Sequence, residues 1–320
     1  MKLHYRQGVA NLSELCVQNG LRHIVIAPGS RNAPLIFSFT SHPQIKTYSI
    51  TDERSAGYFA LGLALQHNAP VGIVCTSGTA TLNFAPAVAE AFYQRIPLMI
   101  FTADRPKELI DQMDGQTINQ SNIYQNFVCK SLEVPVETSH PDDLWYFNRL
   151  ISEGIAEANY QKLPCHINIP LREPLYDDLP AIQNELQTIK TITSQKSIRT
   201  SDAKKLNKAW CQSSKKLIIC GFQSPNTDLQ KELNRLNKDE GVVIINENLS
   251  NIKIDSTIES PDLLFRRLLN DENEASRPDL LITLGESVIS KVLKQYLRKY
   301  KPGLHWNIDP YAQKTDTYKS

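Results

Sequence analysis

The stretch ITDERSAGYFALGLALQ, residues 50–66, joins the end of a β-rich run to an apolar segment that is rich in Gly and Ala. Apolar or small residues fill every position from Ala56 to Leu65, a pattern that favours a helix covered on all sides. Asp52, Glu53 and Arg54 stand where the run gives way to this helix. A strand followed by a buried helix is the repeating unit of α/β proteins, so the stretch predicts the fold class.

The same unit recurs along the chain, because further β-rich runs alternate with helical segments. The runs in the first half are 22–28, 46–52, 70–77, 97–104, 130–136 and 165–171, and those in the second half are 216–222, 241–247, 279–285 and 304–309. Their apolarity is continuous rather than alternating, which indicates strands covered on both faces, as in parallel sheets. We therefore predict two doubly wound, mainly parallel α/β domains.

The composition changes after the sixth run. Residues 173–200 are polar, carry Pro at their start and have little periodicity, which is typical of a connection between domains. We expect a first domain over residues 1–178, a linker over 179–200 and a second domain over 201–320. A chain of 320 residues with 41% hydrophobic content is long enough to give each domain its own core.

Charge and targeting signals exclude several classes of protein. Lys and Arg number 35 against 34 for Asp and Glu, and this balance gives no field that would gather nucleic acid. The N-terminus has no apolar signal segment, and no run approaches the roughly 18 apolar residues of a membrane helix. The six cysteines are scattered without metal-binding spacing. We expect a cytoplasmic protein that neither binds nucleic acid nor inserts into a membrane.

Ligands of open α/β sheets bind beyond the carboxyl ends of the strands. Arg31 and Arg105 follow the first and fourth runs, where each can present a planar guanidinium group to a carboxylate or a phosphate. Each arginine could instead pair with a neighbouring acid such as Asp52 or Asp104. Two arginines at one edge of the sheet favour an anion site.

Glu53 raises a similar choice. A carboxylate in a first helical turn gains about 0.3–1 kcal/mol from the helix dipole, which explains many such residues without a function. In a covered helix, however, a buried Glu needs a partner or a proton. We therefore expect a ligand atom that shares a proton with Glu53. The turn TSGTATLN, residues 76–83, could likewise offer N–H groups to an anion or to a polar ring edge.

Five segments, in this order and spacing, resemble the N-terminal half of the MenD family of thiamine-diphosphate-dependent synthases. They are IAPGSRNAPL, TDERSAGYFALG, TSGTATLNFAPAVAEA, PLMIFTADRPKELID and GQTINQ. The segment LLITLGESVISKVLKQYLRKYKPGLHWNID resembles the end of the middle domain of that family. The resemblance therefore implies a pyrimidine-binding domain followed by a Rossmann-like middle domain.

The resemblance also implies an activity. Members of the family are transferases of menaquinone biosynthesis, in which the carbanion left when 2-oxoglutarate loses CO2 adds to isochorismate. Thiamine diphosphate and Mg²⁺ or Mn²⁺ are the implied cofactors, and a homodimer or a dimer of dimers is the implied assembly. Two alternatives stay open: another thiamine-diphosphate carboligase of the acetolactate synthase type, and a non-catalytic nucleotide-binding regulatory protein.

Residue roles follow from the resemblance position by position. Glu53 matches the catalytic Glu that hydrogen-bonds N1′ of the aminopyrimidine ring and promotes its imino tautomer. Cofactor contacts are implied for Glu53, Pro28, Gly29, Thr79 and Asn83, and substrate contacts for Ser30, Arg31, Arg105, Gln116 and Lys291. Two positions depart from the family: Gly115 stands where Asn or Pro is expected, and Val292 stands where Arg is expected. One guanidinium of the isochorismate site would then be missing or supplied from elsewhere.

The metal site of the family lies in a third domain that carries a GDG sequence followed by an Asn. No GDG occurs in these 320 residues. The resemblance therefore implies a fragment that lacks the C-terminal diphosphate-binding domain and contributes no metal ligand. We expect such a fragment to be inactive by itself.

Overall fold

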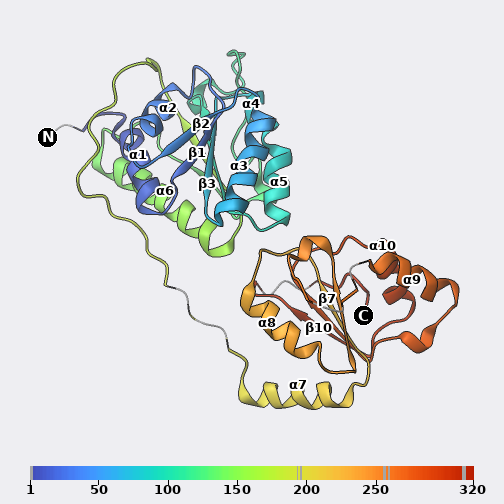
Figure 1. Ribbon diagram of the computed structural model, residues 1–320. Coiled ribbons are helices and arrows are strands. Elements are labelled where there is room, and N and C mark those ends of the chain that lie inside the picture. Colours follow the sequence, from blue (N-terminus) through green and yellow to red (C-terminus); the bar gives the residue numbers. More distant parts are fainter. Residues whose placement is uncertain (1–2, 193, 195–196, 255–256, 259, 312–314) are drawn as a thin grey trace. The chain divides into compact units, whose positions relative to one another are not determined.

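The computed structural model describes residues 3–192, 194, 197–254, 257–258, 260–311 and 315–320. The chain divides into two compact units, Met1–Thr193 and Ser194–Ser320. Each unit is built on a parallel sheet with helices between successive strands (Figure 1). The predicted fold class, two mainly parallel α/β sheets, is confirmed. No helix in the described part of the chain is long and apolar enough to cross a membrane.

The first sheet has six parallel strands in the order β2-β1-β3-β4-β6-β5. Their bounds are β1 His23–Ile26, β2 Lys46–Ser49, β3 Val71–Cys75, β4 Leu98–Asp104, β5 Lys130–Glu133 and β6 Cys165–Pro170. From β1 the chain first builds outward to β2 and then returns to add β3 on the other side. The order thus reverses between β1 and β3, where ligands of open α/β sheets bind.

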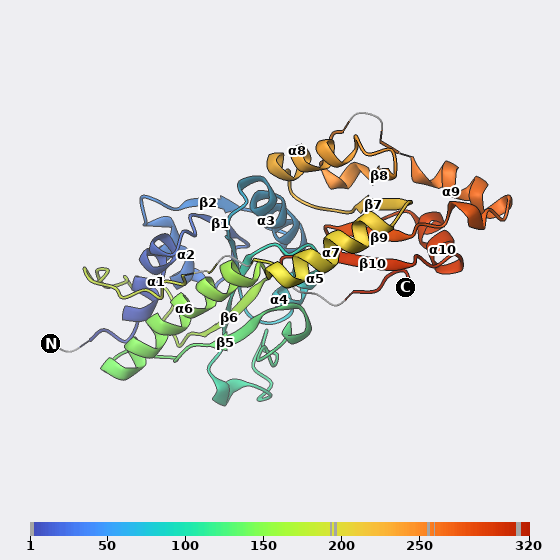
Figure 2. The same cartoon turned by 90° about the horizontal axis from the view of Figure 1, so that it is seen from below.

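Helices cover both faces of this sheet (Figures 1 and 2). Their bounds are α1 Gln7–Gln18, α2 Ala33–Thr40, α3 Glu53–His67, α4 Thr79–Asn83, α5 Ala85–Tyr93 and α6 Pro141–Gln161. Leu12, Phe39 and Ile151, from α1, α2 and α6, belong to one hydrophobic cluster. Ala60 and Val88, from α3 and α5, belong to another. The two clusters are the two sides of a doubly wound sheet.

Helix α3 begins at Glu53 and ends at His67, in agreement with the pattern, but it is covered on one face only. Its buried residues are Ala56, Gly57, Ala60, Leu61 and Ala64. Tyr58, Phe59 and Leu65 are 46%, 42% and 41% exposed. The expected covering on all sides is therefore absent from the described chain, because the sheet and α5 supply a single packing surface.

The second unit contains a four-stranded parallel sheet in the order β10-β9-β7-β8. Its elements are α7 Thr200–Gln212, β7 Lys216–Cys220, α8 Thr227–Leu236, β8 Val242–Asn246, α9 Pro261–Asn270, β9 Leu280–Leu284, α10 Lys291–Lys299 and β10 Leu304–Ile308. The segment before it packs on the first unit, since Leu175, Leu179 and Leu186 join the cluster beneath α1 and α6.

Candidate functional site

The loops after β1, β2, β3 and β4 lie at the carboxyl edge of the first sheet. The loop after β1 is anchored by Asn32, which is fully buried and donates from Nδ2 to the backbone oxygen of Ala27 at 2.9 Å. Arg31 precedes this anchor, and its side chain is therefore fixed at the point where the strand order reverses.

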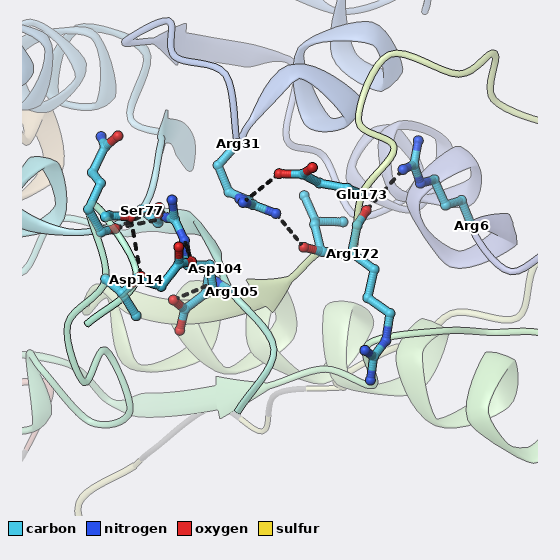
Figure 3. A network of polar contacts seen from close by, with 12 residues as sticks. Arg6, Arg31, Ser77, Asp104, Arg105, Asp114, Arg172 and Glu173 are labelled. Atoms are coloured by element: carbon cyan, nitrogen blue, oxygen red, sulfur yellow. Dashed lines mark hydrogen bonds and ion pairs between the residues drawn. The ribbon is translucent and has the colours of Figure 1, made fainter. Parts of the chain in front are cut away.

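Arg31 is a buried cation, with only 8% of its surface exposed. Its Nη1 donates to the backbone oxygen of Leu171 at 3.0 Å, and its Nη2 lies 3.2 Å from Oε1 of Glu173 (Figure 3). Burial lowers the pKa of Arg31, the charge of Arg105 lowers it further, and Glu173 opposes both. The two arginines therefore act on one another as neighbouring charges.

Arg105 is held by the loops on both sides of it. Its Nε donates to Oδ2 of Asp114 at 2.5 Å, and its Nη1 donates to Oγ of Ser77 at 2.5 Å and to the backbone oxygen of Gln116 at 2.9 Å (Figure 3). The Ser77 hydroxyl donates to the same carbonyl oxygen at 3.1 Å. These bonds fasten the loop after β4 to the turn after β3.

Asp104, the last residue of β4, is 1% exposed and does not form an ion pair with either arginine among the described contacts. Its Oδ1 accepts the backbone N–H of Arg105 at 2.7 Å, and its Oδ2 accepts Nδ2 of Asn168 at 2.8 Å. Burial raises the pKa of Asp104, and these two hydrogen bonds counteract that rise. Asp104 thus fixes the backbone from which the Arg105 side chain extends.

Gln120 is fully buried and joins three strand ends. Its Oε1 accepts the N–H of Gly78 at 2.8 Å, and its Nε2 donates to the backbone oxygen of Ala103 at 3.2 Å and to Oδ1 of Asn168 at 2.9 Å. Gly78 has φ +81°, and a Cβ there would lie 2.7 Å from the backbone oxygen of Gln116. One N–H group of the turn 76–83, whose N–H groups the sequence suggested for a ligand, is therefore used by Gln120.

Glu53 lies half-buried at the first position of α3. Asn83, the last residue of α4, donates from Nδ2 to Oε2 of Glu53 at 3.4 Å. Burial raises the pKa of Cys75, and the charge of Glu53 raises it further, so Glu53 lies near the carboxyl end of β3. Asp52 caps α3 by accepting the N–H of Ser55 at 2.8 Å, which lowers the pKa of Asp52. Asp52 is therefore structural, and Glu53 faces the edge of the sheet.

Known proteins resemble this chain over most of its length. Residues 6–123 match the family described as thiamine pyrophosphate enzyme, N-terminal TPP binding domain. The 2-succinyl-5-enolpyruvyl-6-hydroxy-3-cyclohexene-1-carboxylate (SEPHCHC) synthase of Porphyromonas gingivalis is 41% identical over 314 residues, which cover 98% of this chain and 54% of that protein. The synthase of Flavobacterium psychrophilum is 42% identical over 299 residues, covering 93% and 53%. That of Desulfotalea psychrophila is 39% identical over 316 residues, covering 98% and 59%.

The chain is a homologue of the SEPHCHC synthases. It spans about half the length of the curated relatives that it matches. The matched thiamine pyrophosphate domain contains α1 to α5 and β1 to β4, and therefore Glu53, Arg31 and Arg105 themselves. Leu171 and Glu173, which contact Arg31, lie outside the matched residues.

The structure gathers most of the residues that resemblance to the SEPHCHC synthases assigned to the site. Pro28, Gly29 and Ser30 precede Arg31 in the loop after β1, and the first and third of these are exposed. Thr79 and Asn83 are exposed at the two ends of α4. Gln116 is exposed beside Arg105 and has φ +58°. Lys291 begins α10 in the second unit, where it is exposed, and the adjacent Val292 packs on that unit's core.

Several residues of the site were not predicted from the sequence. Asp114 and Glu173 pair with the two arginines, and Gln120 and Asn168 form the buried network beneath them. Asn168 gave a signal, because it is, with His166, a polar side chain within a largely apolar strand, and such a side chain must find partners when buried. Glu173 gave none, since it lies 142 residues from Arg31 along the chain.

The donors and acceptors at this edge suit one half of a thiamine diphosphate site. Glu53 supplies a carboxylate that can share a proton with a ring nitrogen, and Asn83 holds it by an amide hydrogen bond. In the part of the chain that the structure describes, no group of three or more His, Cys, Asp or Glu side chains could hold a metal ion. The described residues that suit the cofactor are therefore those that would face its aminopyrimidine ring.

Proposed function

We propose that this chain carries the pyrimidine-binding and middle domains of a SEPHCHC synthase of menaquinone biosynthesis. The proposed reaction removes CO2 from 2-oxoglutarate and adds the remaining four-carbon unit to isochorismate. The observation that carries the proposal is the pairing of Glu53 with Asn83 at the same sheet edge as Arg31 and Arg105, in a domain matched by the thiamine pyrophosphate family.

Thiamine diphosphate, when bound, supplies the nucleophilic carbon for this chemistry. The role of Glu53 is to hold a proton shared with N1′ of the pyrimidine ring. Its carboxylate is exposed where it meets Asn83, and a bound ring would exclude water there, which strengthens a hydrogen bond. Asn83 orients the carboxylate, and Pro28, Gly29 and Thr79 line the approach to it. The chain's share of cofactor chemistry is thus proton sharing and orientation.

Arg31 and Arg105 bind the substrates. Both 2-oxoglutarate and isochorismate are dicarboxylates, and planar guanidinium groups match carboxylates in geometry as well as charge. Ser30 and Gln116 flank the two arginines as exposed hydrogen-bonding groups. Lys291, at the start of α10, is proposed as a further substrate-binding residue on the strength of the resemblance alone.

The diphosphate and its Mg²⁺ or Mn²⁺ require ligands beyond those described. We therefore propose that residues 1–320 alone do not turn over substrate. Purified chain would be mixed with thiamine diphosphate, Mg²⁺, 2-oxoglutarate and isochorismate, and product would be sought by mass spectrometry. Formation of SEPHCHC by this polypeptide would contradict the proposal of inactivity.

We also propose that the protein works as a cytoplasmic homodimer or dimer of dimers. Tyr58, Phe59 and Leu65 form an exposed apolar face on α3, although the sequence of this helix is apolar on nearly all sides. A second subunit would cover this face and complete the burial that the pattern predicts.

The activity itself is tested with the polypeptide that the natural reading frame encodes. We expect it to release CO2 from 2-oxoglutarate and to form SEPHCHC when isochorismate is present. Pyruvate replaces 2-oxoglutarate in a parallel assay. Acetolactate from pyruvate, with no product from 2-oxoglutarate, would instead identify an acetolactate synthase type of carboligase.

A further inference from the structure

The ion pair between Arg31 and Glu173 is strongly asymmetric. The side chain of Arg31 is 9% exposed, whereas that of Glu173 is 73% exposed. A buried charge without a partner is strongly destabilising, but an exposed carboxylate loses little when it leaves a partner for water. The guanidinium of Arg31 is therefore fixed in position, whereas the carboxylate of Glu173 can be replaced by another anion.

The backbone around Arg31 keeps the guanidinium in place without Glu173. Nη1 of Arg31 donates to the backbone oxygen of Leu171, and the N–H of Leu171 donates to the backbone oxygen of Asp104 at 2.9 Å. Nη2 of Arg6 donates to the backbone oxygen of Arg172 at 3.1 Å (Figure 3). This turn is thus tied to the end of β4 and to Arg6. Removal of Glu173 leaves these bonds intact.

One donor of Arg31 is unused. Its Nε is buried and has no acceptor among the described residues. Nε and Nη2 lie on the same edge of a guanidinium group, and a carboxylate that binds this edge side-on accepts from both. Glu173 accepts from Nη2 alone. A carboxylate that satisfied both donors would be a better partner than the one now present.

Arg105 repeats this arrangement. Its side chain is 12% exposed, and its partner Asp114 is 41% exposed. Ser77 and the backbone oxygen of Gln116 hold the guanidinium independently of that acid. The site therefore contains two fixed cations, each paired with a more exposed carboxylate, and a ligand with two carboxylates could pair with both cations in place of these acids.

We propose that Glu173 is a resident counter-ion of Arg31, which a carboxylate of an incoming dicarboxylic acid displaces by accepting from Nε and Nη2. This inference rests on the proposed function, which brings dicarboxylic substrates to this edge. Glu173 then has two effects: it balances the buried charge before the ligand arrives, and it weakens ligand binding by competing for Arg31.

The experiment is isothermal titration calorimetry of 2-oxoglutarate into the purified chain at low ionic strength. Glu173→Gln keeps the size of the side chain and removes its charge, and we expect it to bind 2-oxoglutarate about threefold to tenfold more tightly than the wild type. Glu137→Gln is the matched control, since Glu137 is an exposed acid that pairs with Arg172 at 3.2 Å rather than with Arg31. Its affinity should stay within about twofold of the wild type. Arg31→Gln should bind at least about tenfold more weakly.

Each result has one reading. Tighter binding by Glu173→Gln alone supports the exchange. Unchanged or weaker binding by Glu173→Gln, or equal tightening by the Glu137 control, overturns the exchange even if Arg31→Gln still reduces affinity, and in that case the proposed function stands. If Arg31→Gln binds as well as the wild type, or the wild type does not bind 2-oxoglutarate, the anion site of the proposed function fails and the exchange fails with it.

Discussion

Nδ2 of Asn83 lies 3.4 Å from Oε2 of Glu53, so that the last residue of α4 holds the first residue of α3. The contact joins the helices that follow β2 and β3, the two strands on either side of β1, and it orients a carboxylate at the start of a helix. The helix dipole alone would stabilise this carboxylate without giving it a direction. The amide of Asn83 supplies that direction, as a proton-sharing group requires.

The Glu53→Gln variant tests this role. In the polypeptide that the natural reading frame encodes, we expect the rate of SEPHCHC formation to fall about 100-fold or more, because Gln cannot share a proton as a carboxylate does. The free energy of unfolding should change by less than about 0.5 kcal/mol, since the Glu53 side chain is only partly buried. Glu90→Gln, an exposed acid on α5, is the control. A Glu53→Gln enzyme with a tenth of the normal rate would contradict the assignment.

A second prediction concerns the buried amide of Gln120. Gln120→Leu leaves the N–H of Gly78, the backbone oxygen of Ala103 and Oδ1 of Asn168 with one hydrogen bond fewer each. We expect the free energy of unfolding to fall by about 2–4 kcal/mol, as several buried polar groups lose a partner. Urea unfolding of the chain measures it.

The control for Gln120 is Gln125→Leu, which changes an exposed side chain of the same type a few residues later. It should alter the unfolding free energy by less than about 0.5 kcal/mol. Hydrogen exchange should also speed up around residues 111–118 in the Gln120 variant alone. Equal free energies of unfolding for the two variants would show that the buried hydrogen bonds of Gln120 do not stabilise the fold.

The pH dependence of stability should depend on His166. This residue is fully buried between Thr102 and Ser131, and burial lowers its pKa from 6.5 to about 3. In the unfolded chain His166 is therefore protonated below pH 6.5, whereas in the folded chain it stays neutral down to about pH 3. Stability should fall as the pH falls through this window, by up to about 1.4 kcal/mol per unit from this group.

Urea unfolding of the chain at pH values from 4 to 7 measures this effect. His166→Gln should flatten the dependence below pH 6.5, even if it lowers the stability at neutral pH. His140→Gln, which changes an exposed histidine, should leave the slope unchanged. A slope that is the same in all three proteins would mean that His166 is not held neutral by burial.

The pattern of apolar and polar residues along the chain predicted much of this fold, because it indicates which side chains must be buried. Continuous apolar runs predicted the parallel strands, and Asp52 and Glu53 marked the start of α3. Arg31 and Arg105 were recognised from their places after strands. Their acidic partners were not, since the match between Arg31 and Glu173 depends on a turn that the fold brings from 142 residues away. A pattern read along the chain contains no information on such a pair.

The apolar face of α3 leads to the last prediction. Phe59 is 42% exposed and lies beside Tyr58, which is 46% exposed. If this face binds a second copy of the chain, Phe59→Glu places a charge in the interface and should weaken association at least about tenfold, as measured by sedimentation equilibrium.

Leu263→Glu, at a position 78% exposed in the second unit, controls for the added charge and should associate like the wild type. A wild-type chain that stays monomeric at about 50 μM, a concentration at which a Kd near 1 μM would give mostly dimer, would leave this face without a partner copy. Equal association of the two Glu variants would place the contact elsewhere. A dimer broken by Phe59→Glu alone is the result expected of a helix whose sequence is apolar on more sides than its own chain covers.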